Sequence, residues 1–401
     1  MKKIIAFLLL AAMIFTLCAC KKSENSPTEP EATTAPEETV PEQVWLLTEK
    51  TVFFPNGNPS TLITRGYNEK GDVVEYEVVE YEFTGEEYSR TRYTYNEKGD
   101  VTEYTYTEMG EVQVFEKYTY VYDGDKITEK ARLDADGAQV WRRTYSYNAD
   151  NKPLQVLYYD SENVLATTTD YSYDESGALT LTLEYTPLEM EISRYEYRYN
   201  DAGKLLWEAY YESGVPVFSD EFTYDEKGNA VEVIHFEAWD ESTTRSVYEY
   251  DDRGRQVKHL RYNENEEQEY HSEDTYDEMG NLLVHTEFND LGEETSAHYT
   301  IYDEDGNLAV EIYTYWEEET TRYTRKYDNG RLTKKLSYYK GELDITTTYT
   351  YDENGNCISA TDVDNYGNTT GWTTCAFVPI EADGERAAAL RAEQEALLID
   401  R

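Results

Sequence analysis

The stretch that decides the fold is residues 248–254, which read Tyr-Glu-Tyr-Asp-Asp-Arg-Gly. Two tyrosines separated by one residue lie on the same face of a β-strand. An Asp followed three residues later by Gly is typical of a hairpin turn that ends in the left-handed backbone conformation. Close copies of the stretch occur at residues 171–177, 222–228 and 349–355. The pattern predicts a strand that runs directly into a tight turn.

The turn glycines recur with a period near 26 residues. They stand at positions 71, 99, 177, 203, 228, 254, 280, 306, 330 and 355. Asn151 occupies the glycine position of a degenerate copy, and asparagine tolerates left-handed backbone better than most residues. A weaker turn signal falls about halfway between successive glycines. Such regular spacing predicts tandem β-hairpins.

The expected fold class is all-β. A single hairpin is marginally stable in water, so each copy must be supported by its neighbours. A sheet of so many strands is expected to curl. Residues 44–380 are therefore expected to form a long, curled antiparallel meander of hairpins, followed by a short C-terminal capping helix at 381–401. For that helix, packing on the last strands and a frayed, exposed state are both open. Its apolar stripe would consist of Ala387, Leu390, Leu397 and Leu398.

Residues 1–19 have the form of a bacterial export signal. Lys2 and Lys3 precede an apolar run that is too short to span a membrane comfortably. The run ends in Leu17-Cys18-Ala19-Cys20, which resembles the lipobox of bacterial lipoproteins. The resemblance implies that Cys20 is the lipidated first residue of the mature chain; an ordinary secretory signal is the alternative. Residues 20–43 are expected to form the lipid anchor and a disordered Ser/Thr/Pro/Glu linker.

The repeats also resemble a known family. Residues 302–308 (YDEDGNL) and 327–333 (YDNGRLT) are similar to the YD repeat of RHS-type proteins, and the likeness extends over roughly residues 60–360. In that family the repeats form a spiralling β-sheet shell, often around a C-terminal toxin. This sequence departs from the family in its longer period, and it contains neither an Asp-Pro autoproteolysis segment nor a cargo domain after the array. The resemblance therefore implies the fold and not toxin delivery.

Charge limits the classes of partner. The sequence has 82 Asp and Glu against 36 Lys and Arg, a formal net charge of −46. Such a surface repels phosphate backbones, so no nucleic-acid partner is expected. No familiar catalytic or phosphate-binding motif is present, so we expect no enzyme and no cofactor. The five histidines are expected at the surface. Acidic turns such as residues 303–307 are expected to be turn formers, with weak calcium binding left open.

Cysteines and aromatic residues give the remaining site candidates. Cys357 and Cys375 lie symmetrically about Tyr366-Gly367, which suggests a disulfide across a hairpin; two buried thiols are the alternative. The tyrosine ladders could fill the core of the sheet or form a recognition surface. In a recognition surface the candidate ligand contacts are Trp141, Trp207, Trp239 and Trp316.

The expected function is that of a non-enzymatic, surface-tethered interaction module. It would be a repeat lipoprotein of the bacterial cell envelope, anchored to the extracytoplasmic face of the cell membrane by its lipid. The alternatives are a glycan-binding protein of the cell wall or environment, and an accessory or immunity protein of a toxin system.

Overall fold

The computed structural model describes residues 42–382 and 384–399. Within them the chain forms one antiparallel sheet of 26 strands and one helix, α2 (Gly384–Ile399). The strands are β1 (Glu42–Phe53), β2 (Pro59–Tyr67), β3 (Val73–Tyr81), β4 (Glu87–Tyr95), β5 (Val101–Glu108), β6 (Glu111–Asp123), β7 (Lys126–Leu133), β8 (Gln139–Tyr147), β9 (Pro153–Tyr159), β10 (Leu165–Tyr173), β11 (Leu179–Tyr185), β12 (Glu191–Tyr199), β13 (Leu205–Glu212), β14 (Val215–Tyr224), β15 (Ala230–Glu237), β16 (Ser242–Tyr250), β17 (Gln256–Tyr262), β18 (Gln268–Tyr276), β19 (Leu282–Phe288), β20 (Glu294–Tyr302), β21 (Leu308–Tyr315), β22 (Glu318–Asp328), β23 (Arg331–Tyr339), β24 (Glu342–Tyr351), β25 (Cys357–Asp364) and β26 (Thr369–Ala382).

Each strand pairs with the next one along the chain, in antiparallel orientation throughout. One sequence repeat therefore corresponds to two strands and two turns. The all-β class and the succession of hairpins are confirmed.

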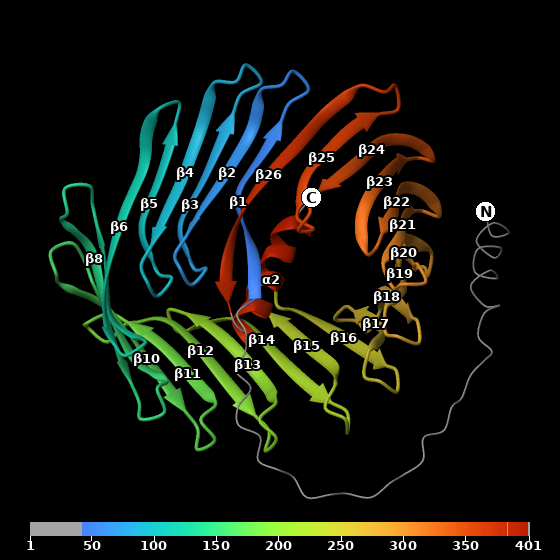
Figure 1. Ribbon diagram of the computed structural model, residues 1–401. Helices are drawn as coiled ribbons and strands as arrows, with labels where there is room; N and C mark the ends of the chain where they lie inside the picture. Colours follow the sequence, from blue (N-terminus) through green and yellow to red (C-terminus); the bar gives the residue numbers. More distant parts are fainter. Residues whose placement is uncertain (1–41, 383, 400–401) are drawn as a thin grey trace, which may run out of the picture. The chain divides into compact units, whose positions relative to one another are not determined.

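The expectation of an open sheet is wrong, because the sheet closes on itself. The first strand, β1, pairs with the last strand, β26, from Glu42 opposite Ala382 to Phe53 opposite Trp372. Figure 1 shows the resulting ring of strands. An open sheet would leave a row of unpaired N–H and C=O groups on each edge strand, and closure pairs both rows. Neither β1 nor β26 carries the Tyr-x-Tyr-Asp motif, so the repeat pattern did not indicate that they pair.

Consecutive turns alternate between the two ends of the ring. Every turn that follows an even-numbered strand is entered through a Tyr-Asp or Tyr-Asn pair, and we call this end the Tyr-Asp rim. The Asp-x-x-Gly or Asn-x-x-Gly motif occurs in most of these turns, and also in some turns of the opposite end. The turns that follow odd-numbered strands form the opposite end. We call it the apolar rim, because large hydrophobic side chains are exposed at most of its turns.

Most turns of the Tyr-Asp rim, and several of the apolar rim, are held by their own Asp or Asn side chain. In the β16–β17 turn, Asp251 Oδ1 accepts the backbone N–H groups of Arg253 and Arg255, both at 2.9 Å. Gly254 donates its N–H to Asp251 O at 3.0 Å and has φ +80°, a conformation that favours glycine. Asn151 has φ +65° in its copy, which confirms that it replaces the turn glycine.

The helix covers the place where the ring closes. In Figure 1, α2 lies inside the outline of the ring, beside β1 and β26. Gln394 accepts the Leu47 N–H at 2.7 Å, and Arg386 pairs with Asp72 at 2.7 Å. The β26 pairing continues to Ala382, so the helix begins at Gly384, later than the 381 expected; the side chains of Leu397 and Leu398 lie outside the described residues. The buried cluster at this contact consists of Val44, Leu46, Ala382, Ala387 and Leu390.

No helix among the described residues is both long and apolar enough to cross a bilayer.

Truncation of Leu390 should weaken the closure of the ring. The side chain is fully buried, so Leu390→Ala should lower the free energy of unfolding by about 2–5 kcal/mol, measured by urea denaturation. The exposed neighbour Ala389 gives a matched control, and Ala389→Ser should change it by less than about 0.5 kcal/mol. Equal urea midpoints for the two variants would contradict this packing.

Candidate interaction surface

A recurring hydrogen bond joins the second motif tyrosine of many repeats to the preceding strand. Tyr250, the last residue of β16, donates its hydroxyl to the carbonyl of Ala230, the first residue of β15, at 2.7 Å. Tyr276 donates to Gln256 O at 2.9 Å in the next repeat. The bond fixes the end of one strand against the start of its partner. The same bond is made by Tyr147, Tyr173, Tyr224, Tyr327 and Tyr351.

Cationic side chains connect successive turns along the Tyr-Asp rim. Lys204 donates to Gly228 O in the next turn at 2.6 Å, and its Nζ lies 5.3 Å from the ring centre of Tyr224. Lys152 bonds to Gly177 O in the same way and lies 5.5 Å from the Tyr173 ring. A cation over an aromatic face stabilises by about 0.5–2 kcal/mol. These side chains therefore bind neighbouring hairpins to one another.

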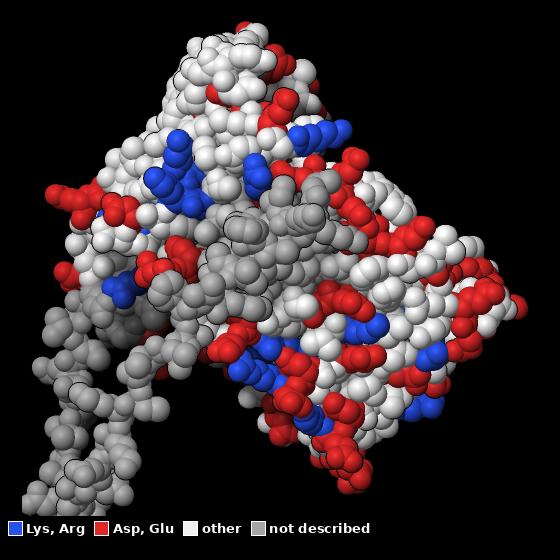
Figure 2. Space-filling view, turned by 90° about the vertical axis from the view of Figure 1, so that its right-hand side faces the viewer, with Lys and Arg blue, Asp and Glu red and all other residues white. Residues whose placement is uncertain are grey.

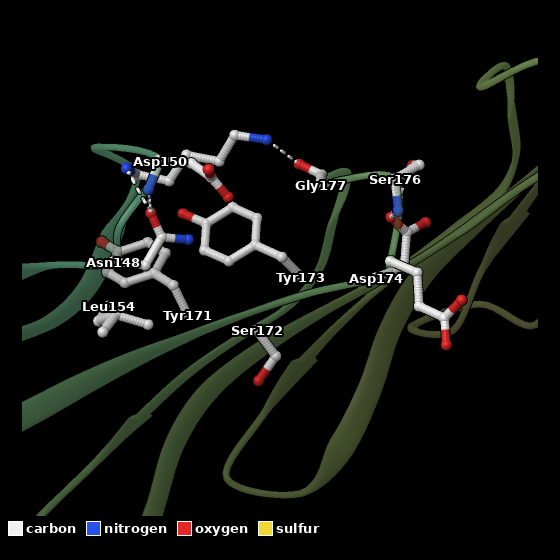
Figure 3. Close-up of a pocket in the computed structure, with 11 residues that line it drawn as sticks. Asn148, Asp150, Leu154, Tyr171, Ser172, Tyr173, Asp174, Ser176 and Gly177 are labelled. Carbon is white, nitrogen blue, oxygen red and sulfur yellow. Dashed lines mark hydrogen bonds between the residues drawn. The ribbon is translucent and has the colours of Figure 1, made fainter.

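A hollow of ≈ 660 Å³ lies between two of these turns (Figure 3). Figure 3 shows the Tyr173 ring between Asn148 and Asp150 of one turn and Gly177 of the next. Asn148 Oδ1 and Asp174 Oδ1 both accept backbone N–H groups of their own turns. Asn148 and Asp174 are thus used in holding the turns, and we assign the hollow a structural role.

The tyrosine face, which bears both motif tyrosines of each repeat, carries runs of contacting rings. In the longest of these runs, Tyr195, Tyr210, Phe218 and His235 follow one another across β12 to β15, with centroid separations of 4.4, 5.8 and 6.1 Å. The ladders expected from the sequence are therefore present. The four side chains are half-buried, which is intermediate between a closed core and a free recognition surface.

A second hollow, of ≈ 360 Å³, lies on the tyrosine face between β8 and β11. Arg143, Tyr145, Tyr158 and Glu184 are among its lining residues. The ring of Trp141 is 6.2 Å from that of Tyr158, so Trp141 stands beside the hollow. Flat aromatic rings next to charged hydrogen-bonding groups can bind small polar ligands.

The four candidate tryptophans are not brought together. Trp141 lies on the tyrosine face, whereas Trp207 lies under Arg198, 4.0 Å from its guanidinium carbon. Trp239 and Trp316 are exposed at turns of the apolar rim, but six strands separate those turns, or about 30 Å. No single groove can contain all four.

Two histidines are paired in a way that sequence reasoning missed. His285 and His298 lie directly opposite each other on β19 and β20. His285 Nδ1 lies 2.7 Å from Asp274, and His298 Nε2 lies 3.4 Å from Glu311. Their separation of 13 residues, half a repeat, was the signal that could have placed them on adjacent strands. The described residues contain no group of three or more metal-ligating side chains.

The acidic turns direct their oxygens to their own backbone. Asp303 Oδ1 accepts the N–H groups of Asp305 and Asn307, at 3.0 and 2.8 Å. The Asn307 side chain donates to both oxygens of Asp303. This arrangement fits the expected role of Asp303 as a turn former.

The structure places Cys357 and Cys375, but not Cys20. Strands β25 and β26 pair with Ser359 opposite Thr374, and continuing this register places Ile358 rather than Cys357 across from Cys375. The two cysteines are therefore one residue out of the direct opposition suggested by the sequence, and the disulfide stays a prediction. Cys20 lies outside the described residues.

Exposed hydrophobic side chains gather at the apolar rim. Leu188, Trp239, Leu291 and Tyr366 have 80, 82, 75 and 86% of their surface exposed. At the Tyr-Asp rim, the side chain of Met279 in the β18–β19 turn is exposed to a similar degree. The other exposed hydrophobic residues at or beside the turns of the apolar rim are Phe83, Met109, Val112, Val164, Met190, Val215, Tyr315, Trp316 and Tyr339.

Comparison with known proteins adds little to this geometry. A family model described as "Uncharacterised protein" matches residues 150–279. No curated protein matches the sequence.

Two solved structures have weak likenesses to the chain. The crystal structure of TcdB2-TccC3-Cdc42 is similar over 84% of this chain and 26% of that one, with 11% identity and a TM-score of 0.28. The chain thus spans about a quarter of that protein. A porin-like protein from Bacteroides uniformis ATCC 8492 is similar over 60% of this chain and 95% of that one, with 12% identity and a TM-score of 0.25. Scores this low carry no argument about the chain.

Removal of the Tyr250 hydroxyl should loosen one hairpin from its neighbour. Tyr250→Phe leaves the Ala230 carbonyl without this donor, and should lower the free energy of unfolding by about 0.5–1.5 kcal/mol in urea denaturation. Tyr366→Phe, at an exposed turn, is the control and should have little effect. If both variants unfold at the same urea concentration, the bond contributes nothing to stability.

The pH dependence of stability should show a plateau with a loss at each end. Burial, with a hydrogen bond to Glu116, raises the pKa of Tyr118 to about 12, and burial also raises the pKa of Tyr197. Their stabilisation is complete below the unfolded pKa of about 10 and is lost as the pH rises above it. Hydrogen bonds from the Asn229 side chain and backbone lower the pKa of Asp225, so its contribution is present above about pH 4 and is lost below it.

Melting temperature measured against pH should therefore fall above about pH 10 and below about pH 4. Absorbance at 295 nm should show the folded chain releasing tyrosine protons later than the urea-unfolded chain. Coincident titration curves for the folded and unfolded chains would refute the raised tyrosine pKa values.

Proposed function

We propose that this chain is a non-enzymatic interaction module, tethered to the extracytoplasmic face of a bacterial cell membrane by a lipid on Cys20. The observation that carries the proposal is the apolar rim of the closed ring. Monomeric soluble proteins rarely expose many large hydrophobic side chains in one region, and such regions commonly mark interaction sites. Leu188, Trp239, Leu291 and Tyr366 are each at least three-quarters exposed there.

The rigidity of the scaffold supports the same proposal. Loops held on a rigid framework commonly carry binding function. Each turn of the apolar rim connects two strands of a sheet that has no free edge, and the opposite ends of those strands are fixed by the tyrosine and cation contacts. A partner would therefore meet turns that are already in place, which lowers the entropy cost of binding.

We also propose that the hairpins are YD-type repeats. Support comes from the role of the motif: Tyr250 bonds to the preceding strand, and Asp251 and Gly254 form the turn that follows. Each residue type of the motif thus has a structural task that recurs in successive copies. The toxin-system alternative has no comparable support in the geometry.

A glycan-binding function is the second candidate, favoured by the hollow beside Trp141. Its lining of Tyr145, Tyr158, Arg143 and Glu184 provides both a stacking surface and hydrogen-bonding groups. Retention on a polysaccharide column that is lost in Trp141→Ala would favour this function over protein binding.

Cell fractionation with chemical cross-linking tests the main proposal. The wild-type chain should be found in the membrane fraction and should cross-link there to a partner that co-purifies with it. Cys20→Ser should release the chain from the membrane fraction, because a lipid with two acyl chains is what provides stable anchoring.

Persistence of the Cys20→Ser chain in the membrane fraction would contradict the tether. Absence of any specific cross-linked partner of the wild-type chain would contradict the interaction function.

A further inference from the structure

The turns of the apolar rim combine exposed hydrophobic side chains with acidic ones. Every exposed hydrophobic residue of this rim has an Asp or Glu within three positions in the sequence. Trp239 is followed by Asp240 and Glu241, and Leu188 and Met190 enclose Glu189. The two chemistries therefore alternate around the rim.

Cations are distributed unequally between the two rims. Among the turns of the apolar rim, all of which the structure describes, the one cationic residue is Lys340. The turns of the Tyr-Asp rim carry Lys70, Lys98, Lys152, Lys204, Lys227, Arg253 and Arg255. Several of these cations are engaged with neighbouring turns, as Lys204 is with Gly228 O. The turns of the Tyr-Asp rim also carry more acidic residues, so the two rims are similar in net negative charge, and the apolar rim differs in joining acidic residues to exposed hydrophobic ones. Figure 2 shows acidic side chains prevailing among the charged groups on the face of the molecule that it presents.

We propose that the apolar rim binds a basic polypeptide segment that also carries apolar side chains. This inference rests on the proposed interaction function and names the chemistry of its partner. Apolar contact would supply much of the affinity, while charge complementarity would supply the rate of association and the specificity.

The same charge argues against two other occupants. A membrane surface with anionic headgroups would repel the acidic turns. A second copy of the chain would bring together two molecules that each carry a net charge of −46. A basic segment would instead be attracted both to the acidic turns and to the net negative charge of the whole chain.

The spacing of the turns gives the register of the partner. Successive turns of one rim are two strands apart, or about 10 Å. A chain in the polyproline-II conformation advances about 3.1 Å per residue with three residues per turn, so every third side chain would point to the same side and lie over a turn. One run of consecutive turns with exposed hydrophobic side chains extends from β19–β20 to β25–β26, and includes Leu291, Trp316, Tyr339 and Tyr366.

A second such run allows a test away from the closure. It extends from β9–β10 to β15–β16, and its last three turns expose Leu188, Met190, Val215 and Trp239. Exchange of these four residues for serine removes apolar surface and leaves the acidic residues in place. Met279→Ser removes one equally exposed side chain from the Tyr-Asp rim, and is the matched control.

The probe is a synthetic peptide of six Lys-Ser-Leu triplets, and its binding to the full chain in phosphatidylcholine nanodiscs is measured by fluorescence anisotropy. The wild-type chain and Met279→Ser should bind it equally. The fourfold serine variant should bind it at least about tenfold more weakly, with an unchanged melting temperature as evidence of folding. Peptides of Glu-Ser-Leu and of Lys-Ser-Ser should bind at least about tenfold more weakly to the wild-type chain.

Equal binding of Lys-Ser-Leu and Lys-Ser-Ser, or equal binding by the serine variant and the wild type, would overturn the inference. A partner that cross-links in cells to the serine variant as well as to the wild type would leave the interaction function standing and remove this rim from it. Absence of any cross-linked partner of the wild-type chain would instead count against the interaction function itself.

Discussion

The structure depends on the hydrogen bond from a motif tyrosine to the strand before it. A hairpin by itself is marginally stable in water, so the order of the chain must come from contacts between neighbours. The hydroxyl of Tyr250 meets the Ala230 carbonyl where β16 ends and β15 begins, and Lys204 bonds one turn to the next. Repetition of these contacts sets the register of the strands and leaves the turns as the variable part of the molecule. The tyrosine and lysine contacts lie at the Tyr-Asp rim, whereas the apolar rim is joined by other bonds, such as the one that Asn58 Nδ2 donates to Phe83 O.

Much of the fold could be predicted from the sequence, because its signals are local. The alternation of Tyr248 and Tyr250, and the turn ending at Gly254, specify a strand and a hairpin within seven residues. The closure could not be predicted in this way. The β1–β26 pairing joins residues more than 300 positions apart, and the strands involved lack the motif. These strands carry apolar residues such as Leu46 because α2 covers them and buries their side chains.

The candidate surface was less accessible to prediction than the fold. Residue type does not determine exposure: Trp239 is exposed at a turn, while Trp207 is half-buried beneath Arg198. The sequence distinguishes the strong turns from the weaker turns between them, but the exposure of hydrophobic side chains at the weaker turns is a property of the folded chain. The pairing of His285 with His298 was likewise hidden until the hairpin register was known.

The closed ring is tested most directly by hydrogen–deuterium exchange of the backbone amides, followed by mass spectrometry. Closure predicts that peptides from β1 (Glu42–Phe53) and β26 (Thr369–Ala382) exchange as slowly as peptides from β16 (Ser242–Tyr250), because all three strands are paired on both sides. Rapid exchange of alternate amides in β1 and β26, with protection kept in β16, would show two free edges and contradict the closed sheet.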